Sequence, residues 1–153
     1  QVFKPVIDDR YAFFKVKSHS GMDYEAVPVN SSAELLEKLD PEATVVGVDE
    51  AQFFDDGIVE VVNQLADRGI RVIVTVLDTD FRGEPFGCMP LMTAKADKVD
   101  KLTAICVVCG EPATRTQRLV GGKPARYDEP IVVVGAAEMY EARCRRCHSV
   151  PKE

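Results

Sequence analysis

The stretch TVVGVDE at residues 44–50 decides the fold of this chain. Its apolar run, 44–48, has the length of one strand, and continuous runs of this kind suit a strand covered on both faces, as in a parallel sheet. A second such run, rich in β-branched residues, extends from Ile70 to Leu77. Between the two runs, four apolar residues keep the spacing of one helix face: Ile58, Val61, Val62 and Leu65. The order strand, helix, strand predicts a βαβ unit in a parallel sheet.

Upstream of this unit the sequence predicts two more strands and a short helix. Val2 to Ile7 has the pattern of a strand, and Glu25 to Val29 that of a shorter one. A capping box, Ser31-x-x-Glu34, predicts the start of a helix that ends near Asp40-Pro41. The segment 12–24 shows no clean period and is expected to be a loop.

The chain changes character downstream of the second apolar run. Residues 79–87 (TDFRGEPFG) have the composition of a turn-rich loop, and a helix is predicted from about Met89 to Lys98. The C-terminal third has too little apolar mass to fold by hydrophobic burial alone, so we expect a unit organised by a metal ion. The predicted domains are therefore an α/β domain over 1–104 and a zinc-binding domain over 105–153.

The cysteines give the strongest local signal. Two pairs, Cys106-x-x-Cys109 and Cys144-x-x-Cys147, each present two sulfurs at the separation that tetrahedral Zn²⁺ requires. A strand near Thr114–Val120 and a Gly121-Gly122 turn are predicted between the pairs. Four protein ligands leave no open coordination position, so we expect a structural Zn²⁺.

Other readings of these residues stay open. The two cysteine pairs are also compatible with a redox or disulfide role. His148, which directly follows Cys147, could replace one of the ligands. Cys88 and His19 are expected to have no chemical role.

Composition excludes several classes of function. The chain has 153 residues, 46% of them hydrophobic and 29% charged, which fits a globular protein rather than a disordered one. The formal net charge is −6 and there is no Lys/Arg-rich run, which argues against a nucleic-acid binder. No apolar stretch has the length of a membrane span, and no signal peptide is visible. Because the chain opens with Gln1 and has no initiating Met, we expect it to be truncated at its N-terminus.

The carboxylates Asp49 and Glu50 follow the first buried strand directly. Ligands of open α/β sheets bind outside the carboxyl ends of the strands. A carboxylate there can hold Mg²⁺ beside nucleotide phosphates, and a second one can accept a proton from an attacking hydroxyl. The alternative is that the pair only caps the following loop.

Aromatic residues and one arginine add weaker signals. Four phenylalanines that fall near two strand ends could hold a flat base, although the residues alone favour ordinary core packing: Phe53, Phe54, Phe81 and Phe86. Arg10 could contact a phosphate bidentately or be a solvated turn residue.

Segments along nearly the whole chain resemble the type II, zinc-containing thymidine kinases. They occur in the family's order, and together they are highly specific although each alone is weak. The segments are VGVDEAQFF at 46–54, LDTDFRGEPFG at 77–87, KLTAICVVC at 101–109, ATRTQRL at 113–119 and the closing segment 133–148, with 3–5 and 8–11 near the start.

The resemblance implies a fold and a reaction. The fold would be a P-loop-kinase-like parallel sheet flanked by helices, with a zinc ribbon that carries a lasso loop. The reaction would transfer the γ-phosphate of ATP to the 5′-hydroxyl of thymidine in nucleoside salvage. In it, Glu50 would be the general base, Asp49 would hold Mg²⁺ through its water shell, and Arg10 would belong to the phosphate site.

The resemblance also implies a base pocket and partners. The pocket would be lined by side chains and by the backbone of the lasso: Phe53, Leu77, Phe81, Phe86, Thr116, Val133, Gly135 and Tyr140. The partners would be thymidine, ATP and dTTP as a feedback inhibitor, and the protein would be a cytoplasmic homotetramer.

One departure from the family is serious. The phosphate-binding loop, GxxxSGK[ST], does not occur in this sequence, and we expect it upstream of Gln1. Its absence leaves open a degenerate regulatory relative that lost this loop. A separate alternative is a non-catalytic zinc-ribbon module that binds nucleic acid or protein.

Overall fold

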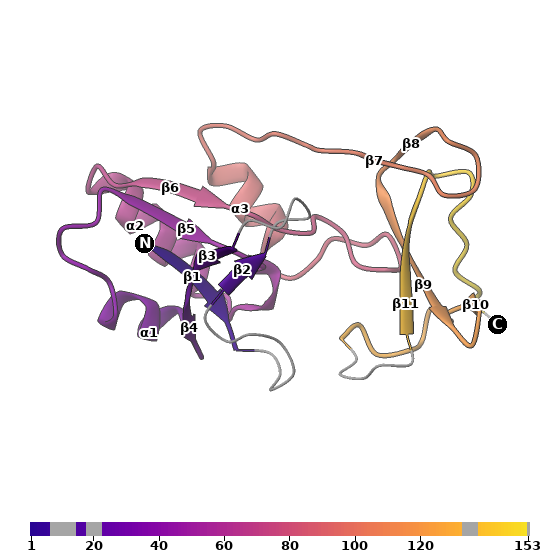
Figure 1. The fold of residues 1–153 in the computed structure, drawn as a ribbon, viewed down its shortest axis with the longest axis horizontal. Coiled ribbons are helices and arrows are strands. Elements are labelled where there is room, and N and C mark those ends of the chain that lie inside the picture. The colour runs from indigo at the N-terminus through magenta and orange to yellow at the C-terminus, as the bar shows by residue number, and fades with distance from the viewer. Residues whose placement is uncertain (7–14, 18–22, 133–137, 153) are drawn as a thin grey trace. The chain divides into compact units, whose positions relative to one another are not determined.

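The computed structural model describes residues 1–6, 15–17, 23–132 and 138–152 (Figure 1). The chain forms two compact units. The first, here called the sheet unit, contains Gln1–Asp78 and Gly87–Ala96. The second, the cysteine unit, contains Thr79–Phe86 and Asp97–Glu153. The loop 79–86 thus belongs to the cysteine unit although it interrupts the sheet unit in sequence, and the division into domains at residue 104 stays a prediction.

A parallel sheet forms the centre of the sheet unit. Its strands are β1 (Val2–Pro5), β4 (Val27–Val29), β5 (Val45–Val48) and β6 (Arg71–Val74), in the order β4-β1-β5-β6. Every neighbouring pair is parallel, and the strands carry their labels in Figure 1. Val46 of β5 lies opposite Val72 of β6. The predicted parallel sheet and its βαβ unit are confirmed.

Three helices accompany this sheet: α1 (Ser32–Glu37), α2 (Ile58–Asp67) and α3 (Met89–Lys95). The helix α1 packs against β4, α2 packs against β6, and α3 packs against α2. Ser31 caps α1, since its hydroxyl accepts a hydrogen bond of 3.2 Å from the Glu34 N–H. The helix α2 buries its apolar face: Ile58, Val59, Val61, Val62 and Leu65. Burial of each such side chain contributes about 1.5–3 kcal/mol, which fixes the helix on the sheet.

Three details differ from the sequence predictions. The strand β6 stops at Val74, and Ile73 is 47% exposed rather than buried. Arg71 and Ile73 share one face of β6 and are exposed, whereas Val72 and Val74 on the other face are partly buried, so this strand is not covered on both faces. The helix α3 ends at Lys95 because Ala96 turns to an extended backbone. The segment expected to be a loop contains an antiparallel pair, β2 (Lys15–Lys17) with β3 (Asp23–Glu25).

The cysteine unit consists of short antiparallel strands. A three-stranded sheet has the order β10-β9-β11, with β9 at Arg115–Val120, β10 at Lys123–Pro124 and β11 at Glu138–Arg143. The predicted strand and the turn after it are confirmed, since Gly121 and Gly122 adopt φ values of 57° and 78°. A second pair joins β7 (Ala104–Ile105) to β8 (Pro112–Ala113).

The helices of the described residues are too short to cross a membrane, and none has the apolar length for it.

Candidate functional site

Two carboxylates lie at the carboxyl end of β5, as predicted. The backbone N–H of Asp49 donates to the Phe3 carbonyl at 2.9 Å, so the register of the sheet still holds this residue. The Asp49 side chain accepts a hydrogen bond from the hydroxyl of Thr75, which follows β6. Two neighbouring strand ends therefore meet at this carboxylate.

Glu50 has a strained backbone. Its φ of 52° and ψ of 42° place it in the left-handed region, and it is the only non-glycine residue with positive φ among the described residues. Such a conformation costs on the order of 1–3 kcal/mol and persists where the surrounding structure enforces it. Here the N–H of Ala51 donates to the Thr75 carbonyl at 3.3 Å, and the N–H of Phe53 donates to the Glu50 carbonyl at 3.1 Å. These bonds direct the chain from β5 into the short 3₁₀ helix η1 (Ala51–Phe53).

The surroundings of Glu50 shift its acidity. Partial burial of the carboxyl group raises the pKa of Glu50, the hydrogen bond from Gln52 lowers it, and the charge of Asp49 raises it again. The net direction is upward. Glu50 is nevertheless an exposed residue, so a solute can reach its carboxylate. A reachable carboxylate with a raised pKa is suited to accept a proton.

Gln52 belongs to this site, and sequence reasoning assigned it no role. The side chain is buried, with 4% of the residue exposed. Its Nε2 donates to a carboxylate oxygen of Glu50, while its Oε1 accepts from the backbone N–H of Leu77 at 3.2 Å. The sequence did offer one indication of a role for Gln52, since it stands two residues after Glu50. Its partner Leu77, however, lies 25 positions away in sequence.

The residues predicted to line a base pocket are distributed over both units. In the sheet unit, Phe53 is partly buried in η1 and Leu77 is 43% exposed. Four described residues of the prediction lie in the cysteine unit: Phe81, Phe86, Thr116 and Tyr140. Three predicted residues lie outside the described part of the chain: Arg10, Val133 and Gly135.

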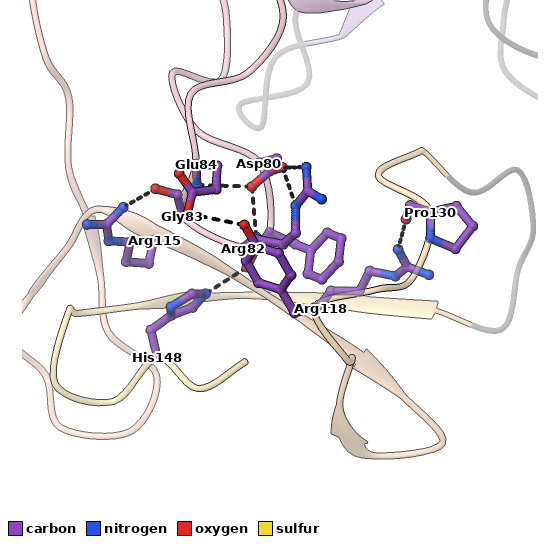
Figure 2. Close-up of polar contacts among 10 residues, drawn as sticks. Asp80, Arg82, Gly83, Glu84, Arg115, Arg118, Pro130 and His148 are labelled. Carbon is purple, nitrogen blue, oxygen red and sulfur yellow. Dashed lines mark hydrogen bonds and ion pairs between the residues drawn. The ribbon is translucent and has the colours of Figure 1, made fainter. Parts of the chain in front are cut away.

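The loop 79–86 is organised around a buried aspartate. Asp80 is 2% exposed, and its Oδ1 accepts from the N–H groups of Arg82 and Glu84 at 2.9 and 3.1 Å (Figure 2). Its other oxygen pairs with the Arg82 guanidinium at 2.7 Å. The buried charge of Asp80 is therefore paired and hydrogen-bonded, which gives the loop a defined shape.

Side chains from other segments of the cysteine unit contact this loop (Figure 2). The ring Nε2 of His148 donates to the carbonyl of Phe81 at 2.8 Å, and Arg115 donates to the carbonyl of Gly83 at 3.0 Å. The Arg118 guanidinium lies 4.9 Å from the centroid of the Phe81 ring, within cation–π range. We name these three side chains, His148, Arg115 and Arg118, the loop clamp.

We predict that His148→Ala loosens the loop without removing the metal site. The lost hydrogen bond is worth about 1 kcal/mol, so amide hydrogen exchange at 81–84 is expected to rise by several-fold. Arg145→Ala is the matched control, because Arg145 is an exposed residue between Cys144 and Cys147. Equal exchange in the two variants, measured by mass spectrometry, would contradict the clamp.

The four predicted cysteines come together in the cysteine unit. The sulfurs of Cys106, Cys109, Cys144 and Cys147 all lie within 4.8 Å of one another, and those of Cys109 and Cys144 are 3.6 Å apart. Tetrahedral Zn²⁺ with Zn–S bonds of 2.3 Å requires sulfurs about 3.8 Å apart. The geometry therefore fits a zinc ion.

The local backbone favours the thiolate form of Cys144 and Cys106, whereas hydrogen bonds with the neighbouring sulfurs of Cys109 and Cys144 raise the pKa of Cys147 to about 12 while no metal is bound. The backbone N–H of Cys147 contributes most to lowering the pKa of Cys144. Burial opposes ionisation of Cys106, but backbone N–H groups outweigh it and lower the pKa of Cys106 to about 6. His148 is not needed as a ligand, since its Nε2 bonds to the Phe81 carbonyl. The cluster can hold zinc through four thiolates.

Comparison with protein families gives a match over most of this sequence. The model of the family described as thymidine kinase matches residues 1–148. The match spans both the carboxylates of the sheet unit and the cysteine cluster.

Proposed function

Since the chain belongs to the thymidine kinase family, we propose that it transfers the γ-phosphate of ATP to the 5′-hydroxyl of thymidine. One observation carries the proposal beyond family membership. Glu50 stands at the carboxyl end of a parallel strand with a raised pKa and a reachable carboxylate, directly beside Asp49. Ligands of such sheets bind at this edge.

The proposed roles follow from the chemistry of phosphoryl transfer. Glu50 accepts the proton of the 5′-hydroxyl, the 5′-oxygen bonds to the γ-phosphorus, and the bond to the β-phosphate oxygen breaks to release ADP. Mg²⁺ that arrives with ATP neutralises charge on the phosphates. Asp49, oriented by Thr75, is proposed to hold this ion through its water shell, and Arg10 to contact a phosphate.

The proposed base pocket combines aromatic rings with backbone groups. Its residues are Phe53, Leu77, Phe81, Phe86, Thr116, Val133, Gly135 and Tyr140. Rings stack on a flat base, and backbone groups read its polar edge without loss of side-chain entropy. Within the cysteine unit, the Phe81 ring is 3% exposed and lies 4.9 Å from the Arg118 guanidinium, which supports a fixed position for this one ring. By family likeness we also propose inhibition by dTTP and a cytoplasmic homotetramer.

A phosphate-transfer assay on the full-length protein tests this proposal. With γ-labelled ATP and Mg²⁺, label is expected in thymidine monophosphate and much less in deoxyguanosine monophosphate. 5′-Deoxythymidine, which lacks the accepting hydroxyl, is expected to compete with thymidine and to remain unlabelled. Equal labelling of deoxyguanosine and thymidine would reject the pocket, and no transfer to any nucleoside would reject the reaction.

A further inference from the structure

The buried carboxamide of Gln52 connects two neighbouring strand ends. It donates to Glu50, which follows β5, and accepts from the backbone of Leu77, which lies beyond the end of β6. Since a backbone N–H can only donate, Leu77 fixes the amide with its oxygen toward the backbone. The NH₂ group must then face Glu50.

The backbone of Gln52 is held as firmly as its side chain. Gly87 packs so close that a Cβ at this position would lie 3.0 Å from the Gln52 carbonyl oxygen. Gly87 also adopts φ of 49°, which an L side chain rarely tolerates. On the preceding residue, the thiol of Cys88 lies 3.9 Å from the Ala51 carbonyl oxygen. The segment between Glu50 and Phe53 thus has little freedom to move.

We propose that Gln52 is a positioning residue that orients the Glu50 carboxylate for proton transfer. The inference rests on the proposed function, in which Glu50 is the general base. A glutamate on a left-handed, exposed turn has several rotamers, and most of them direct the carboxylate away from any one acceptor position. One hydrogen bond from a fixed donor selects a single orientation in advance of substrate binding.

Glutamine suits this task better than leucine or glutamate, the two side chains of most similar shape. It provides a donor and an acceptor at one planar end and carries no charge. Leucine at the same position removes both bonds. Glutamate keeps the acceptor for Leu77 but places a second carboxylate against Glu50, which disfavours ionisation of the pair.

The expected effect has a defined sign. The hydrogen bond from Gln52 lowers the pKa of Glu50 and so opposes the effect of burial. Removing that bond raises the pKa further, and a general base with a higher pKa is lost earlier as the pH falls. The acidic limb of kcat is therefore expected to move to higher pH by roughly one unit in Gln52→Leu and by more in Gln52→Glu.

The experiment measures kcat and KM for thymidine against pH in the full-length protein. Gln64→Leu is the matched control, because Gln64 also donates to a glutamate, Glu60, at 3.2 Å, but on the exposed face of α2. Gln64→Leu is expected to follow the unaltered protein at every pH. Gln52→Leu is expected to keep a lower kcat than Gln64→Leu even at high pH, because Glu50 is then ionised but no longer held in one orientation, with KM for ATP unchanged.

Two results separate this inference from the function on which it rests. If the acidic limb or the high-pH kcat of Gln52→Leu and Gln52→Glu coincides with that of Gln64→Leu, the positioning role is wrong while the kinase reaction stands. If Glu50→Gln retains full turnover, the general base itself is wrong. A ¹³C NMR titration of the Glu50 carboxyl group compares its pKa in the same variants without measuring turnover. If Gln52→Leu fails to fold, Gln52→Glu alone tests the positioning role.

Discussion

Replacing Glu50 by Gln in the full-length protein is expected to lower turnover by roughly 10²-fold or more, while thymidine affinity stays near normal. The carboxamide has the shape of the carboxylate but cannot accept the proton of the 5′-hydroxyl. Its oxygen can still accept the hydrogen bond that Gln52 donates in the unaltered protein. Geometry is therefore retained while basicity is removed.

The loss of turnover in Glu50→Gln is not expected to result from a loss of folding. Glu50 is an exposed residue, and surface substitutions of similar shape change stability by about 0.5 kcal/mol or less. Glu60→Gln, on a side chain that is 61% exposed in α2, is the control for removal of one negative charge. Stopped assays with saturating ATP give kcat, and calorimetry gives thymidine affinity. Turnover equal to that of Glu60→Gln would exclude Glu50 as the base.

The pH profile adds an independent check. Because partial burial raises the pKa of Glu50, turnover of the unaltered protein is expected to fall as the pH drops through that raised value. The residual turnover of Glu50→Gln has no such group and should lack this acidic limb. If the acidic limb of the turnover profile lies at the same pH in both proteins, another residue is responsible for it.

Local patterns made much of this fold predictable. The run before Asp49 and the periodic face of α2 are properties of short segments, so the βαβ unit and the carboxylates at its edge follow from sequence. The exposure of Ile73, at 47%, did not follow, because it depends on which segments cover that face of β6. Residue type predicts an apolar strand, whereas position in the sheet decides which faces are covered.

The missed parts of the site depend on contacts between distant segments. Gln52 gains its role from Leu77, and His148 from the Phe81 carbonyl, which is 67 positions away. No spacing rule connects such pairs. The left-handed backbone of Glu50 could not be predicted from the sequence either. Glutamate has no preference for positive φ, and only the surrounding hydrogen bonds impose it.

The cysteine cluster could be predicted from the sequence in part only. Two CxxC motifs predict a metal site from sequence, because each pair supplies its own geometry. That the loop 79–86 belongs to the same unit could not be predicted, since it lies within the α/β sequence. The consequence is that metal binding and the placement of Phe81 depend on one small unit.

Removal of the metal is expected to have the largest effect on structure. The buried cluster at the metal ligands holds Cys106, Ala113 and Cys144, with Ala142 and Cys147 packed against them. The other buried apolar residues described in this unit are Phe81, Leu119 and Ala125. So few apolar side chains cannot offset the entropy of ordering the strands. Binding of structural zinc contributes about 10–16 kcal/mol at neutral pH, comparable to the whole stability of a typical domain. Without the metal, β9 and β11 are expected to unfold together with the loop 79–86.

The double variant Cys106→Ser, Cys144→Ser removes one buried ligand from each pair and tests this expectation. Elemental analysis should find about one zinc per chain in the unaltered protein and none in the variant. Hydrogen exchange should become fast in the cysteine unit and stay slow in β5 and α2, whose core residues Val46 and Leu65 lie in the sheet unit. Cys88→Ser, also buried but in the sheet unit, is the control and should keep its zinc. An ordered cysteine unit in the metal-free double variant would mean that the metal is not what holds this unit, and the loop with it, in place.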